Sequence, residues 1–304
     1  MSESLPSTRC GYIAIVGRPN VGKSTLLNYL VGQKISITSR KPQTTRHQLL
    51  GIFSDDNTQM IFVDTPGIHR DERRELNRLM NKAAGSAVTD VDVIVFLVDG
   101  TLWTEDDDLV LEKLESTKAP VILVVNKVDK VTPKESLLPH IAEISQKYDF
   151  AAVFPISALK GEHVGELRRD LVNRMPQSEF IYPDDYVTDR SMRFMAAESV
   201  REKLMRQLGK ELPYATTVEI EQYEVDERGI TNISCVIWVE RAGQKNIVIG
   251  KKGQRLKQVG QQAREDLEKL LDAKVFLQLW VKVKAGWADD ERMLKSMGFD
   301  EHQL

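Results

Sequence analysis

The first half of the chain alternates short apolar runs with stretches in which apolar residues recur every three or four positions. The runs predict buried strands, and the stretches between them predict amphipathic helices. This alternation favours the α/β class, with a mostly parallel sheet covered by helices on both faces. The predicted strands cover 13–16, 47–53, 59–63, 91–98, 120–125 and 152–156, and the predicted helices begin at Thr25 or cover 74–88, 106–115 and 165–173.

The second half follows another order, after a segment with two prolines and no periodicity. Helix, strand, strand, helix, loop, helix and strand follow one another, which predicts a separate α+β domain. We predict an N-terminal tail over 1–10, a first domain over 11–174, an extended linker over 175–189 and a second domain with a C-terminal tail over 190–304. The elements predicted in the second domain include helices over 190–208 and 254–271 and strands over 215–225, 230–239 and 274–283.

Charge and cysteine content narrow the class of protein. The chain has 304 residues and a formal net charge of −3, so binding of nucleic acid requires a local basic patch. Cys10 and Cys235 lack metal or redox spacing, which fits a reducing compartment. The apolar runs are too short to span a membrane, and the first ten residues are polar, unlike a signal peptide. We therefore expect a cytoplasmic protein.

Residues 17–24 have the sequence G-R-P-N-V-G-K-S and stand between the first predicted strand and the first predicted helix. In this setting the pattern predicts a phosphate-binding loop, because its glycines let backbone N–H groups turn inward toward an anion. Lys23 would reach the β- and γ-phosphates, and the Ser24 hydroxyl would bind Mg²⁺. At the end of a later strand, Asp64 would hold Mg²⁺ through a water, and the Gly67 N–H would approach the γ-phosphate.

The sequence N-K-V-D at 126–129 predicts the base that the site accepts. A carboxylate at the C-terminal end of a strand in such a sheet lies in the ligand crevice. Asp129 can accept two hydrogen bonds from guanine, which presents N–H and NH₂ side by side, whereas adenine does not. A backbone N–H near Ser157 would meet the guanine oxygen. The residues predicted to contact GTP or GDP are Gly17, Arg18, Pro19, Asn20, Val21, Gly22, Lys23, Ser24, Thr25, Asp64, Thr65, Pro66, Gly67, Asn126, Lys127, Asp129, Ser157 and Ala158.

The second domain carries G-K-K-G at 250–253 between two predicted helices. This loop clamps the RNA backbone in KH modules, and the order of elements is that of the type II KH fold. From Arg241 to Arg264 there are seven basic residues and no acidic one, which supports RNA binding. Residues 247–249 are predicted to form an apolar floor for bases, and Trp103, Trp238 and Trp280 are predicted core residues. The residues predicted to bind RNA are Lys245, Ile249, Gly250, Lys251, Lys252, Gly253, Arg255 and Lys257.

These motifs resemble the Era family of bacterial ribosome-assembly GTPases, a branch of the TrmE-Era-EngA-like group that carries a C-terminal type II KH domain. The likeness covers nearly the whole chain and includes K-P-Q-T-T-R at 41–46. It implies GTP hydrolysis, binding to the 3′ region of 16S ribosomal RNA, action in assembly of the small (30S) ribosomal subunit, and peripheral contact with the inner membrane. We expect the GTP state to be coupled to RNA binding, and we expect a monomer that does not bind DNA.

The resemblance also implies catalytic roles. A threonine of the loop 35–46 would ligate Mg²⁺ in the GTP state, and spacing leaves Thr44 and Thr45 as alternatives. Ile68 stands where Ras-like GTPases carry the glutamine that orients water. In some GTPases with a hydrophobic residue there, an asparagine matching Asn20 helps to hold a K⁺ ion. The predicted metal ligands are Ser24, Thr44, Thr45 and Asp64, and the predicted catalytic residues are Asn20, Lys23, Thr44, Thr45 and Gly67.

Two other classes of function are weighed against this one. An RNA-binding scaffold with little hydrolysis would be favoured if Lys23 or Asp64 were replaced, and both are present. A GTP-regulated switch whose second domain binds a protein would be favoured if acidic residues interrupted the basic run, and none do.

Overall fold

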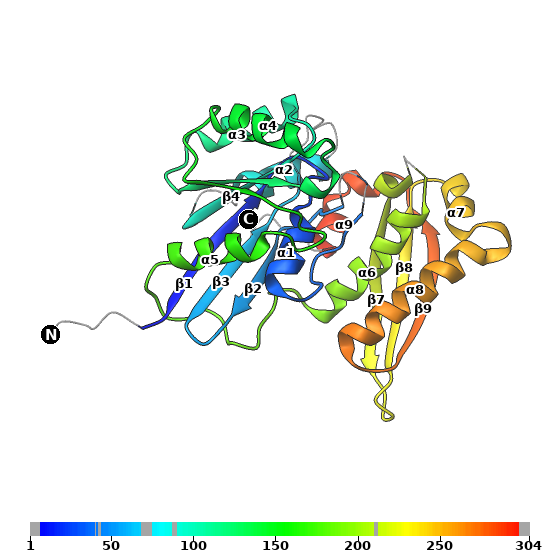
Figure 1. Cartoon of the computed structure of the whole chain (residues 1–304). Helices are drawn as coiled ribbons and strands as arrows, with labels where there is room; N and C mark the ends of the chain where they lie inside the picture. Colours follow the sequence, from blue (N-terminus) through cyan, green and yellow to red (C-terminus); the bar gives the residue numbers. More distant parts are fainter. Residues whose placement is uncertain are drawn as a thin grey trace.

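The computed structural model describes residues 7–39, 41, 44–67, 75–86, 90–209 and 212–297. Its strands form two separate sheets, one of six strands and one of three (Figure 1). Ile68 and three residues of the loop 35–46, at positions 40, 42 and 43, lie outside the described residues. Among the described residues, no helix combines the length and the apolar character that crossing a membrane requires.

The larger sheet has the strand order β2-β3-β1-β4-β5-β6. All neighbouring strands are parallel except β2, which pairs antiparallel with β3. Every residue of β3, β4 and β5 is buried, because helices cover both faces of the sheet. The strands are β1 Arg9–Val16, β2 Leu49–Ser54, β3 Thr58–Asp64, β4 Val93–Asp99, β5 Val121–Asn126 and β6 Ala152–Pro155.

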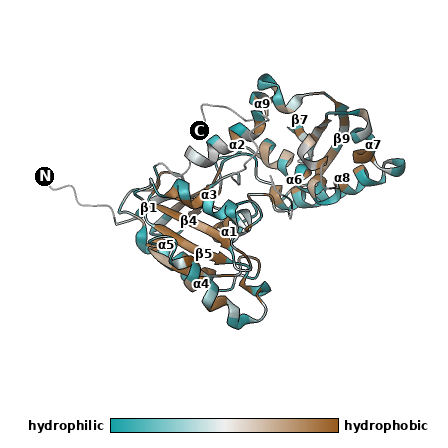
Figure 2. Ribbon diagram, turned by 90° about the horizontal axis from the view of Figure 1, so that it is seen from above, coloured by the Kyte–Doolittle hydropathy of each residue, from teal (hydrophilic) through white to brown (hydrophobic). Residues whose placement is uncertain are grey.

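Two apolar cores lie on the opposite faces of this sheet. Figure 2 shows the apolar character of the strands beside the more polar helices. Helices α1 and α5 pack on one face, and α3 and α4 pack on the other. The α/β prediction is therefore confirmed. The predicted helices do not include 137–145, where the structure has α4; its Pro139 lies in the first turn, a position at which proline is tolerated. The helices are α1 Lys23–Val31, α2 Glu75–Ser86, α3 Glu105–Leu114, α4 Leu137–Ser145 and α5 Val164–Arg174.

The smaller sheet has the order β7-β8-β9, with β7 antiparallel and β9 parallel to β8. Apolar residues of α6 and α8 form a core with the inner face of this sheet. The order of elements is that of the type II KH fold, as predicted. The elements are α6 Met192–Gln207, β7 Thr216–Val225, β8 Thr231–Val239, α7 Ala242–Ile249, α8 Gln254–Leu271, β9 Val275–Val283 and α9 Glu291–Ser296.

The segment between the two sheets runs along the edge of the larger one. The side chain of Gln59 accepts hydrogen bonds from the backbone N–H groups of Ile181 and Tyr182, both at 2.9 Å. The backbone N–H of Ile52 donates to the carbonyl of Val187 at 2.9 Å. These contacts hold the segment on β2 and β3.

The prediction for Trp280 is wrong, since this side chain is 43% exposed on the outer face of β9. Trp103 and Trp238 are partly buried. The fully buried tryptophan is Trp287, which packs against Leu76 of α2. Its indole Nε1 donates to the carbonyl of Ala215 at 3.2 Å, so the C-terminal segment joins the two halves of the molecule.

Candidate nucleotide site and RNA-binding loop

The loop between β1 and α1 adopts a shape that requires glycine at two positions. Gly17 and Gly22 have φ angles of 150° and 112°. A Cβ atom at Gly17 would lie 2.3 Å from the carbonyl oxygen of Leu97, and one at Gly22 would lie 2.3 Å from Asn126 Nδ2. Glycine therefore lets the loop pack directly on the ends of β4 and β5.

Lys23 is buried at the start of α1, and its ammonium group lies against the loop. Nζ donates to the carbonyl oxygens of Gly17 and Arg18, at 2.8 and 3.1 Å. Burial lowers the pKa of Lys23 to about 8, although the nearby Asp64 carboxylate acts in the opposite direction. A buried cation at the beginning of a helix favours an anionic ligand.

Oxygen atoms of three elements meet beside Lys23. Ser24 Oγ lies 2.8 Å from Thr45 Oγ1 and 3.2 Å from Asp64 Oδ2, and Ser36 Oγ donates to the same carboxylate oxygen at 2.9 Å. Asp64 Oδ1 is buried and has no hydrogen-bond partner among the described residues. Thr44 instead donates to the carbonyl of Lys41 at 2.6 Å, away from this group. Hydroxyls with a buried, unpaired carboxylate oxygen fit a hard divalent cation such as Mg²⁺.

The segment after β5 ties the phosphate loop to the loop after β6. Asn126 Nδ2 donates to the carbonyl of Val21 at 2.7 Å, and Asn126 Oδ1 accepts from the backbone N–H of Ala158 at 2.9 Å. Asp129 Oδ1 accepts a hydrogen bond from Ser157 Oγ at 2.7 Å. These bonds hold the Asp129 carboxylate and the Ala158 N–H at fixed positions beside the phosphate loop.

Lys127 is oriented by an acidic residue that has no part in the predicted site. Its Nζ donates to Asp99 Oδ2 at 2.7 Å and to the carbonyl of Asn20 at 2.6 Å. Burial alone would raise the pKa of Asp99, but hydrogen bonds from Lys127 and Thr101 hold that pKa below its ordinary value. Asp99 ends β4, a position at which acidic residues reach the ligand crevice, so its place at the strand end is a signal in the sequence.

A cavity of about 840 Å³ lies above these residues. Its walls include most of the predicted nucleotide contacts, together with both threonines of the loop after α1. The predicted residues that line it are Pro19, Asn20, Gly22, Lys23, Ser24, Thr25, Thr44, Thr45, Gly67, Asn126, Lys127 and Asp129.

The other predicted contact residues do not line the cavity. The side chain of Arg18 points to α3, where Nε donates to Asp107 Oδ2 at 2.9 Å. Thr65 Oγ1 donates to the carbonyl of Ile15 at 3.1 Å. These two side chains therefore support the loop and β1. The predicted residues outside the cavity wall are Gly17, Arg18, Val21, Asp64, Thr65, Pro66, Ser157 and Ala158.

The cavity also has walls that the sequence motifs do not include. Ile37, Thr38 and Ser39 contribute from the loop after α1, and Met205 and Arg206 contribute from α6 of the other half of the molecule. No local pattern indicates that α6, a helix of the second half, reaches the cavity, because this placement depends on how the two halves pack.

The G-K-K-G loop forms a short 3₁₀ turn over Lys251–Gly253 at the beginning of α8. Lys252 has a φ angle of 51°, and a Cβ atom at Gly250 would lie 2.8 Å from Arg255 Cβ. The side chains of Lys251, Lys252 and Lys257 are exposed, whereas Lys245 and Arg255 are half-buried. The loop thus presents two adjacent ammonium groups to solvent.

The apolar floor predicted over 247–249 is only partly present. Val248 is fully buried in the core, Ile249 packs against that core, and Ile247 is 49% exposed. Because the three residues lie on a helix, their side chains point in different directions. Only Ile247 is largely available to a ligand.

A glycine-rich phosphate loop, an N-K-x-D segment and a G-x-x-G loop on a type II KH unit define a GTPase with a KH domain. Two family models match the chain: one described as 50S ribosome-binding GTPase over residues 12–127, and one described as KH domain over residues 211–288.

The chain is 60% identical over 294 residues to GTPase Era of Actinobacillus pleuropneumoniae serotype 5b, covering 97% of each protein. It is similar to a crystal structure of Era in complex with MgGDPNP and nucleotides 1506-1542 of 16S ribosomal RNA, with a TM-score of 0.91 and 40% identity. It is also similar to a variant of Aquifex aeolicus Era bound to GDP.AlF4-, with a TM-score of 0.92 and 39% identity. Each alignment covers 96% of this chain and 99% of the solved chain. The chain belongs to the Era family of GTPases.

Proposed function

We propose that this GTPase binds the 3′ region of 16S ribosomal RNA through its KH domain and acts in assembly of the small ribosomal subunit. The observation that carries the proposal is the cavity whose walls come from both halves of the molecule, since Lys23 of the phosphate loop and Arg206 of α6 both line it. A ligand in this cavity would contact the loop after α1 and the KH domain together. The solved relative that holds MgGDPNP and 16S nucleotides supports the same pairing.

In the nucleotide site, Lys23 and the backbone N–H groups of 17–24 would bind the phosphates. Asp129 would accept hydrogen bonds from the guanine edge, and a backbone N–H of the loop after β6, near Ser157, would donate to the guanine oxygen. Mg²⁺ would be held by Ser24, Thr45 and Asp64, and when bound it neutralises charge on the phosphate oxygens. Thr44 is the less favoured metal ligand, because its hydroxyl turns toward Lys41.

GTP binding is expected to take up protons at mildly alkaline pH. Because the pKa of Lys23 is about 8 in the free protein, roughly half of the molecules carry a neutral Lys23 at pH 8. The triphosphate favours the charged form, so binding raises this pKa and takes up about half a proton at pH 8, and almost none near pH 6.5. Calorimetry in buffers of different ionisation enthalpy measures the uptake. A binding enthalpy at pH 8 that does not depend on the buffer would contradict the expectation.

We further propose that K⁺ accelerates hydrolysis with the support of Asn20. This residue is exposed at the cavity wall and has a φ angle of 65°. A monovalent cation near the phosphates would stabilise developing negative charge as an arginine finger does.

Turnover is expected to be roughly tenfold or more faster in K⁺ than in Na⁺ at equal ionic strength. The Asn20→Gly variant removes the amide while tolerating the backbone angle, so it is expected to lose most of the preference. Phosphate release in the two salts provides the measurement. Equal turnover of the native protein in K⁺ and Na⁺ would refute the proposal.

The RNA site would use Lys251 and Lys252 as phosphate contacts, with the glycines of the loop allowing the RNA backbone to approach. Crosslinking of the full chain to total RNA in the presence of a GTP analogue, followed by sequencing, tests the target. We expect fragments from the 3′ region of 16S ribosomal RNA, and recovery of unrelated RNAs alone would contradict the proposal. A cytoplasmic monomer fits this role, and peripheral contact with the inner membrane stays a prediction.

A further inference from the structure

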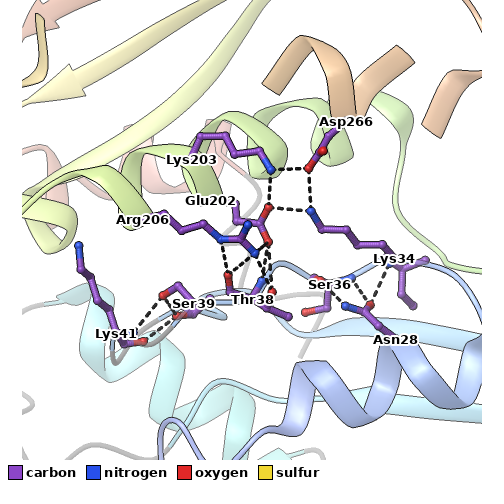
Figure 3. Close-up of polar contacts among 12 residues, drawn as sticks. Asn28, Lys34, Ser36, Thr38, Ser39, Lys41, Glu202, Lys203, Arg206 and Asp266 are labelled. Carbon is purple, nitrogen blue, oxygen red and sulfur yellow. Dashed lines mark hydrogen bonds and ion pairs between the residues drawn. The ribbon is translucent and has the colours of Figure 1, made fainter. Parts of the chain in front are cut away.

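A network of charged residues joins the loop after α1 to two helices of the KH domain (Figure 3). Glu202 of α6 accepts hydrogen bonds from Lys34 Nζ at 2.7 Å, Lys203 Nζ at 3.1 Å and Arg206 at 3.0 Å. Asp266 of α8 accepts from Lys34 Nζ at 2.9 Å and also from Lys203. Lys34 therefore bridges a carboxylate on α6 and a carboxylate on α8.

The network surrounds the carboxylate of Glu202, which is fully buried. The Glu202 side chain has no exposed surface, and burial alone would raise its pKa. Hydrogen bonds from Lys34 and from the Thr38 backbone N–H, at 2.9 Å, instead hold the pKa below its ordinary value. Removing such partners from a buried carboxylate is unfavourable, so the loop and α6 are bound to move together.

Residues 34–38 of the loop after α1 also contact residues of the proposed nucleotide site. Ser36, between Lys34 and Thr38, donates through Oγ to Asp64 at 2.9 Å, and its carbonyl accepts from Asn28 of α1 at 2.7 Å. Both Asp64 and the loop belong to the proposed Mg²⁺ and GTP site. A shift of Ser36 on nucleotide binding would therefore be transmitted within two residues to Lys34 and Thr38.

The far end of the network lies on the helix that carries the RNA loop. Helix α8 begins at Gln254, directly after G-K-K-G, and Asp266 lies 12 residues further, about 18 Å along a rigid helix. Packing of α6 on α8 adds a second link, since Gln207 donates to Gln262 at 3.0 Å. A displacement at Asp266 therefore reaches the lysines of the loop without requiring any change inside α8.

We propose that Lys34 is the coupling residue of this protein: through its ion pair with Asp266 it makes the position of the RNA-binding helix α8 depend on the nucleotide. The inference rests on the proposed function, because it names the contact that connects the GTP site to the RNA site. Lys34 acts through the loop and α8, and it is a positioning residue for both ligands.

The test compares RNA affinity in the presence of a GTP analogue with that in the presence of GDP, by anisotropy of a labelled RNA of nucleotides 1506-1542 of 16S ribosomal RNA. The ratio of the two affinities is the coupling factor, which is about 5- to 150-fold for typical coupled sites. We expect Lys34→Met and Asp266→Asn each to lower this factor at least threefold, and the double variant to lower it no further than the stronger single variant. Lys34→Arg retains the charge and is expected to keep most of the coupling.

The matched control is Lys269→Met, which removes an exposed lysine of α8 one turn after Asp266. It changes the charge as Lys34→Met does and is expected to leave the coupling factor unchanged. Asp266 does not line the cavity, so the Asp266→Asn variant is expected to bind the GTP analogue with the affinity of the native protein. If Lys34→Met and Asp266→Asn both show the native factor, the inference is wrong although the proposed function stands. If the native protein itself has a factor of one, the expected coupling of the GTP state to RNA binding fails, and this inference fails with it.

Discussion

RNA affinity is expected to fall at least a hundredfold when Lys251 and Lys252 are both replaced by Asp. Each substitution converts an exposed ammonium group at the G-K-K-G loop into a carboxylate, so two phosphate contacts become repulsive. The salt dependence should become shallower as well, by about 0.7 units of logarithmic slope for each lost contact with a single strand. Titrations of labelled 16S RNA at several salt concentrations measure both effects.

A control variant with the same change of charge elsewhere in the KH domain distinguishes the loss of this loop from an effect of net charge on RNA affinity. Lys269 and Lys274 are exposed, and their double replacement by Asp alters the charge equally. We expect that control to lose far less RNA affinity, and we expect both double variants to bind GTP with native affinity. Native RNA affinity in the Lys251→Asp, Lys252→Asp protein would remove the assignment of the loop.

The second large effect is expected on the recognition of guanine by Asp129. In Asp129→Asn, an amide that donates a hydrogen bond replaces one of the carboxylate oxygens that would accept from guanine. The variant loses one charge-assisted hydrogen bond of about 1.5–3 kcal/mol and places two donors against each other, which costs about 1–3 kcal/mol more, so GTP affinity is expected to fall by roughly 10²- to 10⁴-fold. Xanthosine triphosphate carries a carbonyl in place of the guanine amino group, and its affinity should rise in the variant.

Competition of GTP and xanthosine triphosphate against a fluorescent nucleotide measures the affinity of the variant for each of them. Asp99→Asn serves as the control, because Asp99 contacts Lys127 and does not line the cavity. We expect that variant to weaken both nucleotides without reversing their order. A preference for GTP that survives in Asp129→Asn would show that another group selects the base.

Much of the fold follows from local patterns. Continuous apolar strands such as Val93–Asp99 can only be buried on both faces, and the motifs stand at the strand ends, where a parallel sheet places its ligands. Local patterns fail where burial depends on distant partners. Trp280 lies in an apolar strand but on its open face, whereas Trp287 belongs to a short polar segment and is buried between the two halves.

In the candidate site, too, some residues follow from local patterns and others depend on distant partners. The phosphate loop, Asp64 and Asp129 are predictable because short motifs with fixed backbone shapes bring them together. Arg206 and Glu202 belong to no such motif. Arg206 lines the cavity and Glu202 contacts Thr38 of the loop after α1 only because α6 packs against that loop. The choice between the two threonines also depends on the loop, which turns Thr45 and not Thr44 toward Ser24.

We expect the guanine nucleotide site and the RNA site of this chain to be thermodynamically coupled, so that a ligand bound at one site changes the affinity of the other. Reciprocity requires RNA to change the affinity for the nucleotide by the same factor as the nucleotide changes the affinity for RNA. The most direct measurement is the dissociation constant of a GTP analogue and of GDP, each with and without saturating 16S RNA. We predict that RNA tightens the analogue severalfold relative to GDP, and identical constants with and without RNA would contradict the account.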